Sequence, residues 1–221
     1  MKKIIMSLML LLSIFSFATK EVITKRSIDY QYNELIQRGF SGKEALNFIA
    51  IDKLINEPDK YILALKAEIN KHPNNYLAYD KLGEAYRTQK SDPENAIKNF
   101  KISVLANRKG YYAFNKLGNL YLNKKDIKTA QVYFENLKKN RPDFPGGFHG
   151  LGIVHALNSE FMEAFNDIST AKNLYKRLDG TKYFEIYRNR GKFIQECDIL
   201  LDKIKAGAFK EYSTKQIDEE I

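Results

Sequence analysis

Apolar positions in the middle of the chain recur at spacings of three and four residues, which is the period of an amphipathic helix. Between residues 76 and 176 one arrangement occurs three times. An aromatic residue precedes Leu-Gly by three positions, an aromatic residue or His follows the Gly by three, and Ala later precedes a large apolar residue by four. The copies are Tyr79, Leu82, Gly83, Tyr86, Ala96 and Phe100; Phe114, Leu117, Gly118, Tyr121, Ala130 and Phe134; and Phe148, Leu151, Gly152, His155, Ala164 and Ile168.

The period of this pattern is nearly constant. Leu82 and Leu117 are 35 residues apart, and Leu117 and Leu151 are 34 apart. A fixed period near 34 is typical of a helical repeat array. Gly in a helix costs about 1 kcal/mol relative to Ala, so its presence at the same place in all three repeats indicates a packing requirement. We therefore expect a neighbouring helix to approach closely at each Gly.

Start signals lie between the two helices of each repeat. Ser91 and Glu94 predict a capping box, with Pro93 in the first turn. Asp126 and Ser159 are the N-cap candidates of the next two repeats. The extra residue of the first period is expected in the turn before Pro93.

These motifs resemble tetratricopeptide repeats (TPRs). The resemblance implies an all-α fold, an α-solenoid in which antiparallel helix pairs stack into a superhelix with a concave groove. It assigns repeats to residues 76–110, 111–144 and 145–178. The sequence departs from the family pattern at the first-helix Trp, which is Tyr79, Phe114 or Phe148, and at the closing Pro, which is kept only at Pro142.

The flanking segments follow weaker versions of the same pattern. Residues 19–41 predict a linker with a short helix that ends at Gly39, and Ser41 and Glu44 predict another capping box. Residues 42–75 read as a degenerate repeat, with helices from about Gly42 to Ile55 and up to about Lys71. Residues 179–206 predict a C-terminal capping helix that Gly191 kinks or splits, and residues 207–221 a polar tail.

The first 18 residues predict a secretory signal peptide. Two lysines precede an apolar stretch from Ile4 to Phe17, and small residues surround Ala18. The stretch is short for a membrane span, since 14 residues rise roughly 21 Å. We expect a periplasmic or secreted protein; the alternative is an inner-membrane anchor that is not cleaved. The formal net charge is +9, which suits peripheral contact with an anionic envelope surface, and no nucleic-acid partner is expected.

The sequence predicts no enzyme, cofactor or metal site. Its three histidines lack the spacing of paired metal ligands, and His155 is expected to be an interface residue in the place of Tyr. Cys197 is the sole cysteine. Its position on the apolar face of a helix favours a buried structural thiol over an interchain disulfide.

The resemblance implies that the second, fifth, ninth and twelfth positions of each first helix line the groove. Asp80 and Glu84 would repel the carboxylate that one TPR subset grips, so that function is not expected. Asn115 and Asn119 lie four residues apart, and two interpretations stay open. Their amides could hydrogen-bond a peptide backbone, or they could be solvated polar positions. The predicted groove residues are Leu77, Asp80, Glu84, Arg87, Tyr112, Asn115, Asn119, Leu122, Gly146, His149, Ile153 and Ala156.

Two functions follow as hypotheses. The first is an exported interaction scaffold or adaptor that binds a peptide or helix of another cell-envelope protein in its concave groove. The second is a structural protein that self-associates or docks on an envelope surface. The identity of the partner and the oligomeric state are left open by the sequence.

Overall fold

The computed structural model describes residues 31–33, 35–36, 39–108, 110–180 and 183–206. The secondary structure of these residues is helical, and none of them forms a strand. The chain divides into two compact units, residues 1–61 and 62–221. The predicted signal peptide and polar tail lie outside the described residues. In the part that is described, no helix combines the length and the apolar character needed to cross a membrane.

The first unit contains α2 (Gly42–Asp52), which starts at the predicted capping box. Glu44 N–H donates to the Ser41 side chain, and the Ser41 N–H donates to the Glu44 carboxylate at 2.8 Å. Gly39 has a φ of +90° and its N–H bonds to Ile36 O, which confirms it as a helix C-cap. Helix α2 ends three residues before the predicted Ile55, because the chain there tightens into turns that bond over three residues.

Helix α3 (Pro58–Lys71) begins at Pro and ends as predicted. Its first four residues belong to the first unit, where Tyr61 OH donates to Asp52 Oδ1 at 3.2 Å. The rest of α3 belongs to the second unit. The reading of residues 42–75 as a degenerate repeat therefore stays a prediction.

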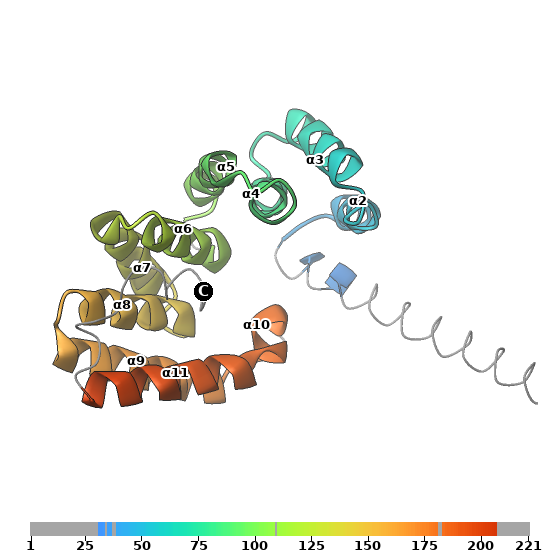
Figure 1. Ribbon diagram of the computed structural model, residues 1–221. Helices are drawn as coiled ribbons and strands as arrows, with labels where there is room; N and C mark the ends of the chain where they lie inside the picture. The colour runs from blue at the N-terminus through green and yellow to red at the C-terminus, as the bar shows by residue number, and fades with distance from the viewer. Residues whose placement is uncertain (1–30, 34, 37–38, 109, 181–182, 207–221) are drawn as a thin grey trace, which may run out of the picture. The chain divides into compact units, whose positions relative to one another are not determined.

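The second unit contains three pairs of helices. Helix α4 (Tyr76–Gln89) pairs with α5 (Pro93–Ala106), α6 (Tyr111–Asn123) with α7 (Ile127–Asn140), and α8 (Pro145–Leu157) with α9 (Phe161–Lys176). The pairs stack in chain order, with α5 against α6 and α7 against α8 (Figure 1). This arrangement confirms the predicted α-solenoid.

Each repeat Gly accommodates the large apolar residue of the second helix in its own repeat. A Cβ on Gly118 would lie 2.5 Å from the Phe134 ring, and one on Gly83 would lie 2.9 Å from the Phe100 ring. A Cβ on Gly152 would lie 2.5 Å from Ile168. The structure thus confirms the packing requirement and shows that the neighbouring residue belongs to the second helix of the same repeat.

The turns between paired helices repeat as well. Ser91, Lys125 and Ser159 all have a positive φ, of 51°, 63° and 64°. Asp126 N–H bonds to Tyr121 O across five residues, which is the Schellman arrangement at a helix end. The equivalent bond of the first repeat spans six residues, from Asp92 N–H to Tyr86 O. The extra residue of the first period therefore lies in this turn, as predicted.

Two of the predicted N-caps are wrong. Ser91 and Ser159 occupy the left-handed positions, which leaves the next residue to begin each helix. Asp92 caps α5 by accepting from Asn95 N–H at 3.0 Å, and Glu160 is the N-cap residue of α9 without a side-chain cap bond. Asp126 caps α7 as predicted, accepting from Thr129 N–H.

The C-terminal segment forms two helices, α10 (Phe184–Arg188) and α11 (Arg190–Lys205). The break lies at Asn189, whose N–H bonds to Ile186 O, and not at Gly191. Helix α11 packs on α9 and covers the end of the array, as expected of a capping helix. Cys197 is fully buried in this contact, which confirms it as a buried thiol.

Candidate functional site

The first helices α4, α6 and α8 carry all of the predicted groove positions, which together are called the first-helix face below. Helix α8 can approach its neighbours because its first turns are rich in Gly. A Cβ on Gly147 would lie 2.7 Å from the backbone N of Lys138, at the end of α7. Helix α6 contacts α8 as well as α7. The close approach of α8 fixes the spacing of the side chains along this face.

Several predicted residues of the first-helix face are buried. Leu77 and Asp80 are each 6% exposed, and Leu122 is 1% exposed within the core cluster around Phe134. The expectation that these three side chains line an open groove is therefore wrong. Gly146 and Ala156 are buried too. Helix pairing requires an apolar stripe wider than the sequence spacing alone suggested.

Asp80 has a structural contact inside the first repeat. The hydroxyl of Ser103, on α5, donates to Asp80 Oδ1 at 2.5 Å. Ser103 is 2% exposed, so this bond joins the two helices away from water. A buried carboxylate must be hydrogen-bonded to be tolerated. Asp80 therefore ties α4 to α5 and does not provide the acidic groove residue that was predicted.

Glu84 is paired with two cations. Arg87 donates to both of its carboxylate oxygens, at 2.6 Å and 3.2 Å, and Lys116 Nζ lies 3.5 Å from Oε1. Burial acts to raise the pKa of Glu84, but the hydrogen bond from Arg87 and the charge of Lys116 outweigh it and hold the pKa below its usual value. Lys116 Nζ also lies 5.2 Å from the centre of the Tyr112 ring.

This cluster links α4 to α6, and its net charge is +1. The Lys116 and Arg87 side chains are 25% and 38% exposed. The two carboxylates predicted for this end of the face therefore add no net negative charge to its exposed surface, because Asp80 is buried and Glu84 is paired with cations. The side chains that are exposed or partly exposed at this end of the first-helix face are cationic and aromatic.

Asn115, Asn119 and Ile153 are partly exposed in the middle of the face. A Cβ on Gly146 would lie 2.7 Å from Asn115 Oδ1, so the Asn115 amide points to the start of α8. Ile153 packs against the core clusters on both of its sides. Of these three residues, Asn119 is therefore the one whose side chain is not assigned to packing between helices.

His149 lies against the C-terminal part of the array. Its Nδ1 is 3.2 Å from Tyr175 OH, and Tyr175 stacks on Phe193 of α11 with ring centres 5.1 Å apart. Burial lowers the pKa of His149 to about 4, so the ring is neutral near pH 7. His149 therefore belongs to the junction of α8, α9 and α11.

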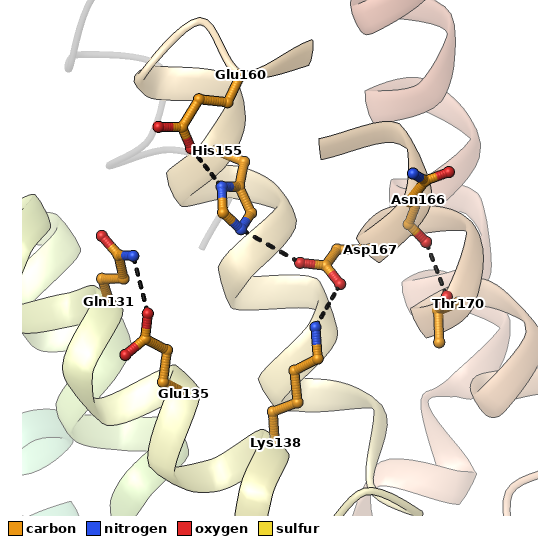
Figure 2. A network of polar contacts seen from close by, with 8 residues as sticks. All are labelled: Gln131, Glu135, Lys138, His155, Glu160, Asn166, Asp167 and Thr170. Carbon is orange, nitrogen blue, oxygen red and sulfur yellow. Dashed lines mark hydrogen bonds and ion pairs between the residues drawn. The ribbon is translucent and has the colours of Figure 1, made fainter. Parts of the chain in front are cut away.

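A polar network that the sequence did not reveal joins α7, α8 and α9 (Figure 2). Lys138 Nζ lies 2.8 Å from one oxygen of Asp167, and His155 Nε2 lies 3.5 Å from the other. His155 Nδ1 lies 2.5 Å from Glu160. His155 is thereby confirmed as an interface residue. The available signal was Asp167, a carboxylate next to Ile168 on the buried face of a helix.

A second unpredicted contact joins the C-terminal segment to the middle repeat. Tyr183 is 1% exposed, and its hydroxyl donates to Asp143 at 2.7 Å and contacts Arg141. The Arg141 guanidinium lies 5.5 Å from the ring of Tyr111 and 5.2 Å from that of Tyr183. Burial raises the pKa of Tyr183, so its hydroxyl stays protonated.

The polar contacts described above hold helices and turns of the repeats together. In the described part of the chain, no three His, Cys, Asp or Glu side chains gather as metal ligands. Burial raises the pKa of the Cys197 thiol to about 12, which keeps it protonated and a poor nucleophile.

The fold is similar to that of known repeat proteins. MamA from Desulfovibrio magneticus RS-1 (41-end) has a TM-score of 0.52 at 15% identity, over 76% of this chain and 96% of that one. A second MamA structure has a TM-score of 0.51 at 20% identity, over 76% and 95%. PilF of Pseudomonas aeruginosa has a TM-score of 0.51 at 14% identity, over 71% and 77%. These are TPR proteins.

The chain has the TPR fold. No protein-family model matches the sequence, and no curated protein does. The similarity therefore lies in the stacking of the TPR helices and in the positions that support it, and not in overall sequence.

Proposed function

We propose that this protein is an exported TPR scaffold that holds an extended or helical segment of another cell-envelope protein on its first-helix face. The observation that carries the proposal is the three-repeat array, whose first helices present a partly exposed row of cationic, aromatic and amide side chains. The sequence of residues 1–18 supports export. TPR arrays have extended surfaces of this kind, since each repeat contacts its neighbours and leaves one face of the stack available.

Asn119 is the side chain best placed to report on such a partner. It is partly exposed in the middle of the face, and its amide both donates and accepts hydrogen bonds, as a peptide backbone requires. Asn136 on α7 offers a matched control, because it is exposed on a second helix and its amide donates to Val132 O.

The test compares Asn119→Ala with Asn136→Ala in capture of partners from a native envelope extract. Loss of a hydrogen bond worth about 1 kcal/mol should weaken capture through Asn119 about fivefold, with no change for Asn136. Equal capture by both variants and the unmodified chain would contradict the use of this face.

Export is tested separately by the intact mass of the protein recovered from the envelope. The proposal predicts a chain that begins at Thr19, after removal of the segment through Ala18. A mass that includes residues 1–18, from protein held in the inner membrane, would contradict export with cleavage. It would support the alternative of an inner-membrane anchor.

The alternative function is self-association or docking on an envelope surface, and the net charge of +9 favours it. Attraction between exposed charges is screened over about 10 Å at 0.1 M salt. Retention on envelope material that persists at high salt would therefore contradict this alternative.

A further inference from the structure

The two edges of the TPR stack differ in charge. At one edge the second helices end and the next first helices begin. Asn140 at the end of α7 donates to Arg108 O, just beyond the end of α5, at 3.0 Å. Leu137, Phe144 and Leu178 share one core cluster, which brings the ends of α7 and α9 together with the start of α8. This edge is called the second-helix-end edge.

Four exposed cations lie along the second-helix-end edge, from successive helix ends. Arg108 follows α5, Lys139 lies in the last turn of α7, and Lys176 and Arg177 end α9. Within the described residues, no ion pair is recorded for these four.

The acidic residues of this edge are fewer than its cations. Asp143 is engaged by Arg141 and Tyr183, and Asp179 is the other carboxylate at this edge. Lys138 and Arg141 are engaged as well, the first with Asp167 and the second with Asp143. Asp179 is thus the one remaining carboxylate against the four cations among the described residues of this edge, and the remaining charge of the edge is positive.

The opposite edge is balanced. There the first helices end and the second helices begin, as the Lys124–Glu94 ion pair at 2.7 Å shows for α6 and α5. Within the third repeat, His155 Nδ1 of α8 lies 2.5 Å from Glu160 at the start of α9. The lysines of this edge are Lys90, Lys124, Lys125 and Lys128, and its carboxylates are Asp92, Glu94, Asp126, Glu160 and Glu163.

Cations in the last turn of a helix also complement its dipole. That effect acts within the last turn of a helix, and it accounts for Lys139 in α7 and Lys176 in α9. It does not account for Arg108, which lies beyond the end of α5, or for the excess of cations over carboxylates along the edge.

We propose that the second-helix-end edge binds the acidic phospholipid surface of a membrane. A row of exposed cations along one edge fits a flat anionic surface, whereas an acidic peptide would be expected to bind on a face with pockets for its side chains. The sequence prediction of a signal peptide or membrane anchor around Ile4 to Phe17 supports a membrane as the surface that this edge binds. This role does not depend on the partner-binding function proposed above.

The test uses the full chain and vesicles of phosphatidylcholine with or without 30% phosphatidylglycerol. The measured quantity is the ratio of the two affinities, so the contribution of the N-terminal apolar segment cancels. The edge variant carries Arg108→Gln, Lys139→Gln, Lys176→Gln and Arg177→Gln. The control variant carries Lys90→Gln, Lys124→Gln, Lys125→Gln and Lys128→Gln, which gives the same net charge.

A basic residue at such a surface strengthens binding about fivefold, so the edge variant should lose about 100-fold or more of the ratio. The control variant should change less than about threefold, and replacing Lys139 and Lys176 by Arg should preserve binding. Equal losses in the two Gln variants would overturn the proposal, because net charge alone would explain them. It would also be overturned by an unmodified chain that binds both vesicles equally, or that prefers polyglutamate to anionic vesicles. Helical circular dichroism checks that all variants are folded.

Discussion

At the scale of single residues, Asp80 shows how burial changes the meaning of a repeat position. The position is expected to face a partner in a TPR array, but here its carboxylate accepts from Ser103 inside the first repeat. A charge-reversing variant at Asp80 would therefore test folding and not recognition.

We predict that Asp80→Lys lowers the free energy of unfolding by about 3 kcal/mol or more, because it places an unmatched ammonium in a buried site. Glu84→Gln, at a partly exposed site, should cost about 1 kcal/mol or less. Urea unfolding measures both. If Asp80→Lys were as mild as Glu84→Gln, the buried bond to Ser103 would not be present in solution.

His149 gives a pH-dependent prediction. Its pKa is about 4 in the folded chain and near 6.5 when unfolded, so the unfolded chain binds the extra proton first as the pH falls. Stability should be unaffected by His149 above pH 6.5 and should fall between pH 6.5 and pH 4, by up to about 3 kcal/mol.

The measurement is urea unfolding at several pH values for the unmodified chain and for His149→Gln. The difference between the two curves should shrink as the pH falls, since the variant lacks the titrating group. Parallel curves for His149→Gln and the unmodified chain would contradict a His149 that is neutral in the folded chain near pH 7.

At the scale of elements, the repeat glycines determine how closely helices pair. Gly118 receives the Phe134 ring and has no room for a Cβ, whereas nothing lies within 4 Å of a Cβ on Gly191 in α11. The two glycines therefore differ in function, although both are in helices.

We predict that Gly118→Ala destabilises the fold by about 1–3 kcal/mol through overpacking against Phe134. Gly191→Ala should be neutral or stabilise by up to about 1 kcal/mol, because Ala is the better helix former. Urea midpoints of the two variants give the comparison. A neutral Gly118→Ala would mean that α6 and α7 are further apart than the structure places them.

The element scale also shows what the sequence could predict. The period near 34 residues and the Leu-Gly pairs were sufficient to predict the three helix pairs. The sequence also placed Cys197 correctly on a buried helix face. The N-caps at Ser91 and Ser159 were misplaced by one residue, because a left-handed turn residue has no strong signal when it is Ser or Lys.

The candidate site was less predictable than the fold. Repeat positions give the direction of a side chain from its helix, but Leu122 and His149 are covered by elements that are distant in the sequence. The contacts of Asp167 and Tyr183 depend on pairs that are 29 and 40 residues apart, beyond the reach of local spacing.

At the scale of the whole molecule, the second unit has three surfaces with different proposed roles. The first-helix face is proposed to bind a protein segment, and the second-helix-end edge an anionic membrane surface. Helix α11 covers the end of the array and keeps the apolar face of α9 from water. Each assignment concerns different residues, so each can fail without the others.

The most direct measurement is photocrosslinking in the native envelope, with a photoreactive residue at Asn119 on the first-helix face or at Val132 on a second helix. Val132 is 54% exposed and serves as the matched position away from that face. We predict that one dominant envelope protein is crosslinked from position 119 and that it is not crosslinked from position 132. Crosslinks at 119 only to other copies of this chain, or the same partners from both positions, would contradict partner capture on the first-helix face.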